Sequence, residues 1–348
     1  MLKRRTRMAA YADAGVDAEL AGRLIGRFIQ KFPASPLLPK NYFCQLVRIP
    51  AAISSEDLYV ALSTDGVGTK ILLGIETGMC GGLGQDLVGM IYNDLITSGA
   101  QPSAFLDYYA TGKLAPAVYR TILASIVDAC NACAMPLLGG ETAELPGLYA
   151  RGHFDLAGFG IGWVKPADIL SPERVRPGQI LVGFPSSGFH SNGYSLIRKV
   201  LSRTSARLSE RLSLSGRRRS LKEFLMEPTR LYTGVIEKIR IKQITVSSLA
   251  HITGGGYYEN VPRAVPADCG IVLSRSAFDV ESAELFRWFS RRANLSWEDM
   301  LHIFNCGFGL VAICEESALS AISAHFPGAV RLGGIERKTG AARVRLAA

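Results

Sequence analysis

The chain has 348 residues, of which 48% are hydrophobic and 20% charged, and its formal net charge is +9. This length favours about two domains with a core large enough to fold without disulfide or metal crosslinks. The composition excludes a chain that is disordered throughout. No apolar run reaches the ~18 residues that a membrane helix needs. Seven cysteines without a secretory leader predict reduced thiols, so we expect a soluble, cytoplasmic protein.

The excess positive charge gathers near the N-terminus, at Lys3–Arg7, and in residues 203–222. The second stretch contains few aromatic residues and many serines, which argues against a groove for nucleic acid. Two interpretations stay open for it: a solvated surface segment, or a surface that attracts phosphate groups.

The hydrophobic pattern predicts alternating helices and strands, an α/β (α+β) fold. In the first half the predicted helices cover residues 11–31, 83–98 and 115–133, and the predicted strands cover residues 58–63, 104–109, 136–138 and 155–164. Prolines then mark a change in composition near residues 165–175. We therefore predict two domains, 1–168 and 169–348. In the second, strands at 179–184 and 310–314 and a helix at 194–201 are expected.

A glycine-bearing turn follows the first predicted strand, from Thr64 to Lys70. Asp65 is a possible Mg²⁺ ligand, the glycines allow backbone amides to approach oxygen atoms, and Lys70 suits a phosphate. The order of residues is not that of a Walker A loop. A plain tight turn is an equally good interpretation of these residues alone.

Two more groups of carboxylates stand in the first half. Asp86 and Asn93 are seven residues apart on a predicted helix, so they lie nearly above one another, with Asp94 beside them. They either face water or bind something. The turn predicted at Gly139–Glu144 places Glu141 at a strand end, which suggests a shared site for Mg²⁺ and a triphosphate.

The second half carries two loops suited to anions. Ser186–Gly193 precedes a helix, where free backbone amides and the positive end of the helix dipole favour phosphate. His190, within this loop, is able to donate to a phosphate or move a proton. His251–Gly256 contains three consecutive glycines, which favour either close backbone approach to a ligand or a flexible linker.

Taken together, these motifs resemble the aminoimidazole ribonucleotide synthetase (phosphoribosylformylglycinamidine cyclo-ligase) family. The resemblance covers most of the chain and rests on the order of the motifs. They lie at residues 11–17, 63–70, 93–95, 105–114, 139–147, 186–196, 228–232, 251–256, 259–263 and 304–307.

The resemblance implies a two-domain ATP-binding fold whose N-terminal sheet dimerises into a β-barrel. It also implies the ATP- and Mg²⁺-dependent cyclisation of formylglycinamidine ribonucleotide, a small-molecule substrate, in purine biosynthesis. No nucleic-acid or membrane partner is expected.

Carried over by motif, the implied site has four sets of residues. The catalytic candidates are Asp65, Asp94 and His190, and the metal candidates are Asp65, Asp94 and Glu141. The ATP-binding candidates are Thr64, Gly66, Gly68, Thr69, Lys70, Asn93, Asp107 and Glu141. The substrate-binding candidates are Ser186, Ser187, Gly188, Asn192, Thr253, Gly254 and Gly255.

The chain departs from the family pattern before its first strand. A run of the form Gly-Gly-Phe-Gly-x-Leu is usual there, whereas this chain has Leu38-Pro-Lys-Asn-Tyr-Phe-Cys-Gln-Leu46. Residues with a Cβ approach phosphate less closely, so closure over ATP is expected to be altered, slowed or lost. Two alternatives stay open: a related ATP-dependent kinase of the wider superfamily, and a paralogue that binds nucleotide or substrate as a regulatory or scaffold protein, which only the missing glycines support.

Overall fold

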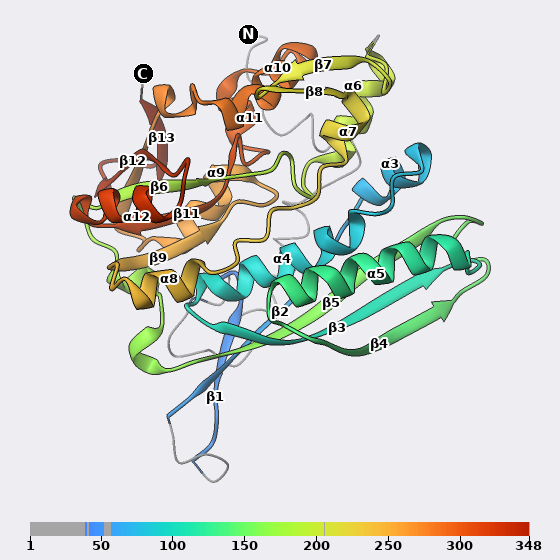
Figure 1. The fold of residues 1–348 in the computed structure, drawn as a ribbon. Coiled ribbons are helices and arrows are strands. Elements are labelled where there is room, and N and C mark those ends of the chain that lie inside the picture. Colours follow the sequence, from blue (N-terminus) through green and yellow to red (C-terminus); the bar gives the residue numbers. More distant parts are fainter. Residues whose placement is uncertain (1–38, 40–41, 52–56, 205, 348) are drawn as a thin grey trace.

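The computed structural model describes residues 39, 42–51, 57–204 and 206–347, so the helix predicted at 11–31 lies outside the described residues. The first sheet has the strand order β1-β2-β5-β3-β4 (Figure 1). Its strands are β1 (Gln45–Arg48), β2 (Tyr59–Gly66), β3 (Gln101–Thr111), β4 (Leu137–Glu144) and β5 (Phe154–Val164). Strands β3 and β4 are parallel and are joined through helix α5 (Pro116–Ala132), whereas the other neighbours are antiparallel.

Helices α4 (Leu83–Thr97) and α5 cover one face of this sheet (Figure 1). Alternate residues of β5 that face α4 include glycines, and a Cβ on Gly158 or Gly160 would overlap the Ile91 side chain. Small residues at these positions let the helix lie close to the strands. A short helix, α3 (Lys70–Thr77), leads from β2 towards α4.

The second sheet has the order β13-β10-β12-β6-β11-β9. Its strands are β6 (Ile180–Pro185), β9 (Val246–His251), β10 (Cys269–Ser274), β11 (Phe308–Cys314), β12 (Val330–Arg337) and β13 (Val344–Ala347). The helices of this half are α6 (Tyr194–Arg203), α7 (Leu221–Leu225), α8 (Val235–Ile241), α9 (Gly256–Asn260), α10 (Glu284–Ala293), α11 (Trp297–Leu301) and α12 (Leu319–His325). A separate hairpin, β7 (Arg211–Leu214) and β8 (Arg217–Ser220), occupies half of the basic stretch 203–222.

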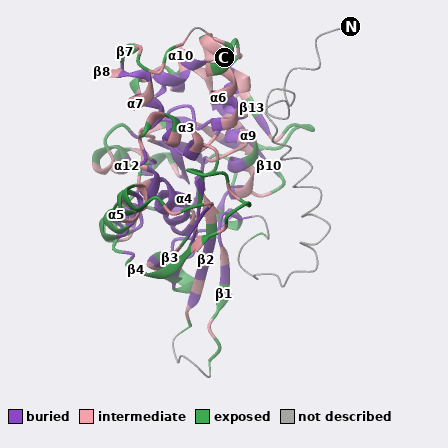
Figure 2. Cartoon of the chain, turned by 90° about the vertical axis from the view of Figure 1, so that its right-hand side faces the viewer, coloured by how far each residue is buried: buried purple, intermediate pink, exposed green. Residues whose placement is uncertain are grey.

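Helix α4 is buried along nearly its whole length (Figure 2), with the first sheet on one side and residues 227–232 on the other. Asp86 on this helix is fully buried and forms an ion pair with Lys70 at 2.7 Å. Its carboxylate also accepts hydrogen bonds from the Thr229 amide (2.8 Å) and hydroxyl (2.7 Å), while Lys70 donates to the Glu227 carbonyl. The buried charge is thus fully partnered, as burial demands.

Asn93 makes a similar junction two turns further along α4. Its amide nitrogen donates to the Arg230 carbonyl at 2.9 Å, and its amide oxygen accepts from the Tyr232 amide at 3.1 Å. Gln85 donates to the Thr229 carbonyl from the same helix. Neither Asp86 nor Asn93 faces water, so that interpretation was wrong. Both side chains hold residues 227–232 of the second half against the first.

The predicted turn at Gly139–Glu144 was also wrong, because β4 continues to Glu144. Gly140 pairs with Asp107 on β3, and a Cβ on Gly140 would overlap the Asp107 carboxylate, so glycine here answers a cross-strand contact rather than a turn. Likewise β2 extends through Asp65 and Gly66, which were expected in a turn. The predictions for α4, α5, β3 and β5 are confirmed to within a few residues.

Among the described residues, none of the helices has the length and apolar character needed to cross a membrane. All seven cysteines are buried and unpaired. Burial raises the pKa of Cys130 and of Cys133 to about 12, so this close pair packs as small apolar side chains.

We predict that Lys70→Met destabilises the protein by about 3–5 kcal/mol, because it leaves the Asp86 carboxylate buried without its counter-charge. Chemical denaturation of the purified variant measures this loss. The double variant Lys70→Met/Asp86→Leu should recover much of it, since both charges are then removed. A single variant as stable as the parent chain would contradict the structural role of the pair.

Candidate active site

Two predicted site carboxylates meet where β2 ends beside α4. Asp65 lies at the end of β2, and Asp94 lies on the last turn of α4. Burial raises the pKa of Asp65 to about 6, with the neighbouring Asp94 charge adding to the rise. The Gly66 amide donates to Asp65 at 2.7 Å and opposes this shift. The two carboxylates therefore form a half-buried, mutually repelling pair.

His251 connects this pair to the second half. It is the last residue of β9, it is fully buried, and its Nδ1 lies 2.8 Å from Asp94 Oδ1. Among the described residues its Nε2 has no hydrogen-bond partner. An Nδ1–H donated to Asp94 fixes the carboxylate's orientation and leaves the second carboxylate oxygen for another ligand.

Arg263 and the segment Tyr42–Cys44 border the same carboxylates. The Arg263 guanidinium stands 4.0 Å from the Phe43 ring centroid. Burial lowers the pKa of Arg263, and the Asp94 charge opposes this. The Tyr42 hydroxyl donates to the backbone carbonyls of Thr97 and Leu249, each at 3.1 Å. This segment is the one that lacks the expected glycines, and here its bulky side chains are docked beside Asp94.

His190 is buried in the loop before α6 and adopts a left-handed backbone conformation, with φ of 58°. Its Nε2 accepts a long hydrogen bond (3.4 Å) from the Ser187 amide, while Nδ1 has no partner among the described residues. Burial lowers the pKa of His190 well below the usual value, and His251, Lys70 and Arg230 lower it further. This histidine is therefore neutral at physiological pH.

The two predicted loops of the second half, residues 186–193 and 251–256, lie together beside the start of α3 in the first half. Asn192 accepts a hydrogen bond from the Gly254 amide at 2.9 Å, which ties the two glycine-bearing loops together. The Thr69 and Ser195 hydroxyls lie 3.1 Å apart, joining the start of α3 to the start of α6. Gly255 has φ of 85° and opens α9, a conformation that favours glycine.

A cavity of about 490 Å³ adjoins the loop that begins at Ser186. Residues 186–188 form one wall, and Arg217 of β8 and Ser282 are among the residues on the others. The Ser187 hydroxyl donates to the Pro228 carbonyl at 2.5 Å, and Ser186 donates to Asn305 at 2.9 Å. Internal hydrogen bonds thus fix the shape of this wall. Its size suits a small ligand.

Other predicted residues are placed differently. Lys70 and Asn93 are fully buried and engaged by the protein itself, so neither faces a ligand in this structure. Asp107 lies half-buried beneath α5, where its charge raises the pKa of Cys130. Glu141 is exposed on β4, three strands from β2, which corresponds to ~14 Å at the usual strand spacing.

The remaining predicted residues frame the convergence point. The Thr64 hydroxyl donates to the Gly158 carbonyl at 2.7 Å, and Gly68 has φ of 72° just before α3. Thr253 donates to Asn260 at 3.3 Å, which holds the loop after β9. These residues support the backbone around Asp65 and His251.

Two carboxylates suit Mg²⁺ when substrate phosphates and water complete its coordination. Asp65 and Asp94 meet that condition, because their mutual repulsion favours a cation between them. Among the described residues no group of three or more His, Cys, Asp and Glu side chains converges on a metal position, so Glu141 does not join them within one chain.

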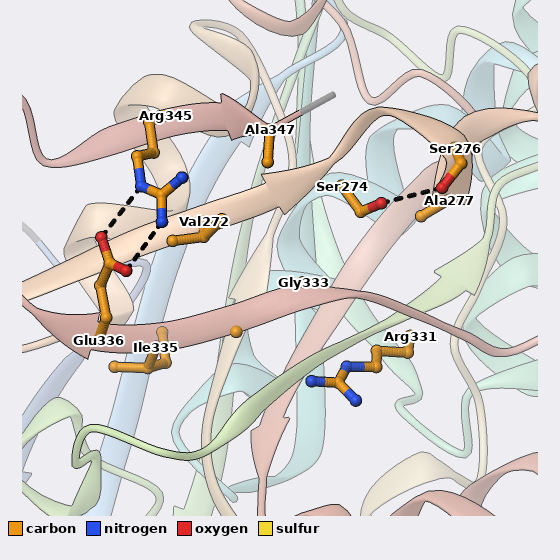
Figure 3. Close-up of a pocket in the computed structure, with 11 residues that line it drawn as sticks. Val272, Ser274, Ser276, Ala277, Arg331, Gly333, Ile335, Glu336, Arg345 and Ala347 are labelled. Atoms are coloured by element: carbon orange, nitrogen blue, oxygen red, sulfur yellow. Dashed lines mark hydrogen bonds and ion pairs between the residues drawn. The ribbon is translucent and has the colours of Figure 1, made fainter.

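A larger hollow, of about 570 Å³, lies over β10, β12 and β13 (Figure 3). Arg345 and Glu336 are joined there by two contacts of 2.9 and 3.1 Å, and Ser274 pairs with Ser276. None of the predicted site residues lines it. We therefore place the candidate site at the Asp65–Asp94–His251 junction and not at this hollow.

Sequence reasoning did not name His251 and Arg263 as site residues. Both stand in the quoted motifs, at the start of the loop 251–256 and at the end of the segment 259–263. Their spacing of 157 and 169 residues from Asp94 carries no local signal. One local feature marks His251. It is an ionisable residue at the end of a buried strand, shortly before the glycine run 254–256.

Comparisons with known proteins bear on the family of the chain. Residues 44–164 match the family model "AIR synthase related protein, N-terminal domain", and residues 176–343 match the corresponding C-terminal domain. The chain is 37% identical, over 95% of both sequences, to a protein from Nitratidesulfovibrio vulgaris named phosphoribosylformylglycinamidine cyclo-ligase.

Two solved structures share the fold. Hydrogenase maturation protein HypE in complex with ATP superposes with a TM-score of 0.62 at 18% identity, covering 96% of this chain and 93% of that one. Thiamine monophosphate kinase from Aquifex aeolicus gives a TM-score of 0.59 at 12% identity, covering 94% of each chain. At these identities the likeness extends to the fold alone.

His190 predicts a specific pH dependence of stability. In the folded chain it stays neutral, whereas the unfolded chain takes up a proton below the ordinary histidine pKa of ~6.5, so stability falls as pH falls through that value. The contribution is about 1.4 kcal/mol per pH unit. His190→Asn, which tolerates the left-handed conformation, should lose this component in denaturant titrations between pH 7 and 5. An unchanged slope would contradict the assignment.

Proposed function

The chain belongs to the AIR synthase related protein family, and on this basis we propose that it is a phosphoribosylformylglycinamidine cyclo-ligase. It converts formylglycinamidine ribonucleotide and ATP into aminoimidazole ribonucleotide, ADP and phosphate. The observation that carries the proposal is the meeting of Asp65 and Asp94 with His251 at the point where the loops of the second half converge.

In the proposed reaction the formyl oxygen of the substrate takes the γ-phosphoryl group of ATP, and ADP leaves. The amidine nitrogen then attacks the activated carbon, the ring closes, and the carbon–oxygen bond breaks with release of phosphate. Such chemistry depends mainly on positioning and on neutralising phosphate charge.

The proposed roles follow from the placement of the groups. Asp65 and Asp94 would hold Mg²⁺, which would supply charge neutralisation for the triphosphate. His251 is a positioning residue, since it is fully buried and orients Asp94 by a 2.8 Å hydrogen bond. The cavity beside Ser186–Gly188 takes the substrate's phosphorylated end, with Arg217 opposite.

A homodimer completes the proposed site. The face of the first sheet opposite α4 exposes large hydrophobic side chains, a sign of an interaction surface. They include Val47, Leu106, Tyr108, Phe159 and Trp163, which are 37–52% exposed. Glu141 pairs in register with Tyr108 and so belongs to this uncovered face. In the dimer Glu141 reaches a site from across the interface, as it does not reach one within its own chain.

The cytoplasm is the proposed compartment. All seven cysteines are buried as free thiols, which is usual where thiols stay reduced.

One observation favours a second function, a paralogue that binds ligand without turnover. Tyr42, Phe43 and Cys44 are at most 6% exposed, and Tyr42 and Cys44 stand in place of two of the usual glycines. The Asp94 charge is one of the influences that raise the pKa of Cys44, after burial itself, so this segment lies next to the carboxylates. A closed, docked segment there impedes nucleotide entry or closure.

Release of ADP from Mg·ATP, with and without formylglycinamidine ribonucleotide, separates the two functions. The cyclo-ligase predicts ADP release that depends on the substrate and equals formation of the imidazole product. Asp65→Asn should lower kcat/KM for ATP on the order of a hundredfold, with little change in unfolding. Nucleotide binding without turnover in the parent chain supports the paralogue, and normal turnover by Asp65→Asn contradicts the metal assignment.

His251 has its own prediction. His251→Leu should reduce kcat by about tenfold or more, because Asp94 loses the hydrogen bond that orients it. His251→Asn keeps a donor near the position of Nδ1 and should retain more activity than the leucine variant. Equal losses in both, with equal loss of stability, would show that the imidazole serves packing only.

A further inference from the structure

A basic pocket lies between α3 of the first half and α6 and α7 of the second, and Figure 1 shows these helices on the same side of the molecule. Its volume is about 740 Å³. Arg198 of α6, Arg207 of the following loop and Lys222 of α7 line it, with Glu76 of α3 as the single opposing carboxylate. The predicted site residues are absent from its walls.

The three cations differ from their neighbours in being unpaired. Arg217 and Arg219 share the carboxylate of Glu227, at 3.8 and 2.5 Å. Arg292 binds Glu210 at 3.2 Å. In the part of the chain that the structure describes, no ion pair or side-chain hydrogen bond engages Arg198, Arg207 or Lys222. Like charges held around one hollow repel each other unless an anion binds between them.

The backbone holds the pocket wall in place. The Lys222 amide donates to the Leu208 carbonyl at 2.9 Å, and the Leu221 amide donates to Glu210 at 2.7 Å. These bonds fix the loop that carries Arg207 against α7. The serine hydroxyls of Ser202 and Ser209 add polar groups to the lining. Backbone hydrogen bonds therefore hold the segments that carry these cations in place.

We propose that this pocket binds a small phosphorylated anion, of the size of a nucleoside diphosphate or pyrophosphate, at a site separate from the Asp65–Asp94 junction. The enclosed volume lies in the range of small-molecule sites, and three cations against one carboxylate match a ligand with two or more negative charges. A flat basic face would instead suit a nucleic acid.

The location allows such a ligand to influence the active site. Helices α3 and α6 begin together, where Thr69 and Ser195 lie 3.1 Å apart, and the pocket lies at their other ends. From Ser195 to Ser202 the helix rises about 10 Å. An anion that bridges the far ends holds the two halves of the chain at a fixed spacing. The binding itself does not depend on the proposed reaction.

Calorimetric titration of the full chain with inorganic pyrophosphate, in EDTA to suppress metal-dependent binding elsewhere, tests the proposal. We expect saturable binding with one site per chain. Arg198→Gln and Arg207→Gln should each weaken it about tenfold or more. Arg218→Gln, a neighbouring exposed arginine outside the lining, is the matched control and should bind as the parent does. Asp65→Asn should also bind normally, whether or not the chain is a cyclo-ligase.

Three results would overturn the proposal. The first is the absence of saturation at about millimolar pyrophosphate. The second is an equal loss in Arg218→Gln, which would indicate diffuse attraction by the basic stretch. The third is competition by single-stranded RNA at far lower concentration with a steep dependence on salt, which would identify a nucleic-acid surface. Unchanged circular dichroism and thermal midpoints of the variants ensure that lost binding is not lost folding.

Discussion

The polar side chains of the buried helix α4 determine how the rest of the molecule is arranged. A helix enclosed on both sides is normally apolar, yet α4 carries Asp86 and Asn93 at zero exposure. Each of these groups costs free energy unless it is bonded. Their partners are Lys70 of the first half and the backbone of residues 229–232 of the second half, and the bonds to residues 229–232 exist only when the two halves of the chain are docked. The docking therefore has one permitted register.

That register places the candidate site. Asp94 follows Asn93 directly, so the residues that fix the segment 229–232 also fix the direction in which the Asp94 carboxylate points. From the other side, β9 carries His251 to within 2.8 Å of it. A site built at such a junction gains rigid geometry from both halves. It also means that the sequence of α4 alone does not separate the two roles of its polar residues. Asp86 and Asn93 hold the halves together, whereas Asp94 belongs to the candidate site.

This is why the sequence predicted the elements better than the contacts. Local periodicity located α4 and α5, and turn chemistry located the loop before α6. Asp86 and Asn93 stand on the same helix as the catalytic candidate Asp94, and nothing local distinguishes a carboxylate that binds Lys70 from one that binds a metal. The partner atoms at Thr229 lie 143 residues away. The prediction of a turn at Gly140 was wrong for a related reason. A glycine is needed there because a Cβ would overlap Asp107 on the neighbouring strand, and not because the chain turns.

The parts of the chain that depart from the family pattern lie around this shared junction. Tyr42 anchors the segment without glycines to the end of α4 and to β9 by two backbone carbonyls, so the departure extends the same interdomain contact. The basic pocket lies at the opposite ends of α3 and α6 from the site, again between the two halves. Both features therefore lie at contacts between the two halves, which the buried helix also holds together. Changes at either place therefore reach Asp94 through packing and do not require any new catalytic group.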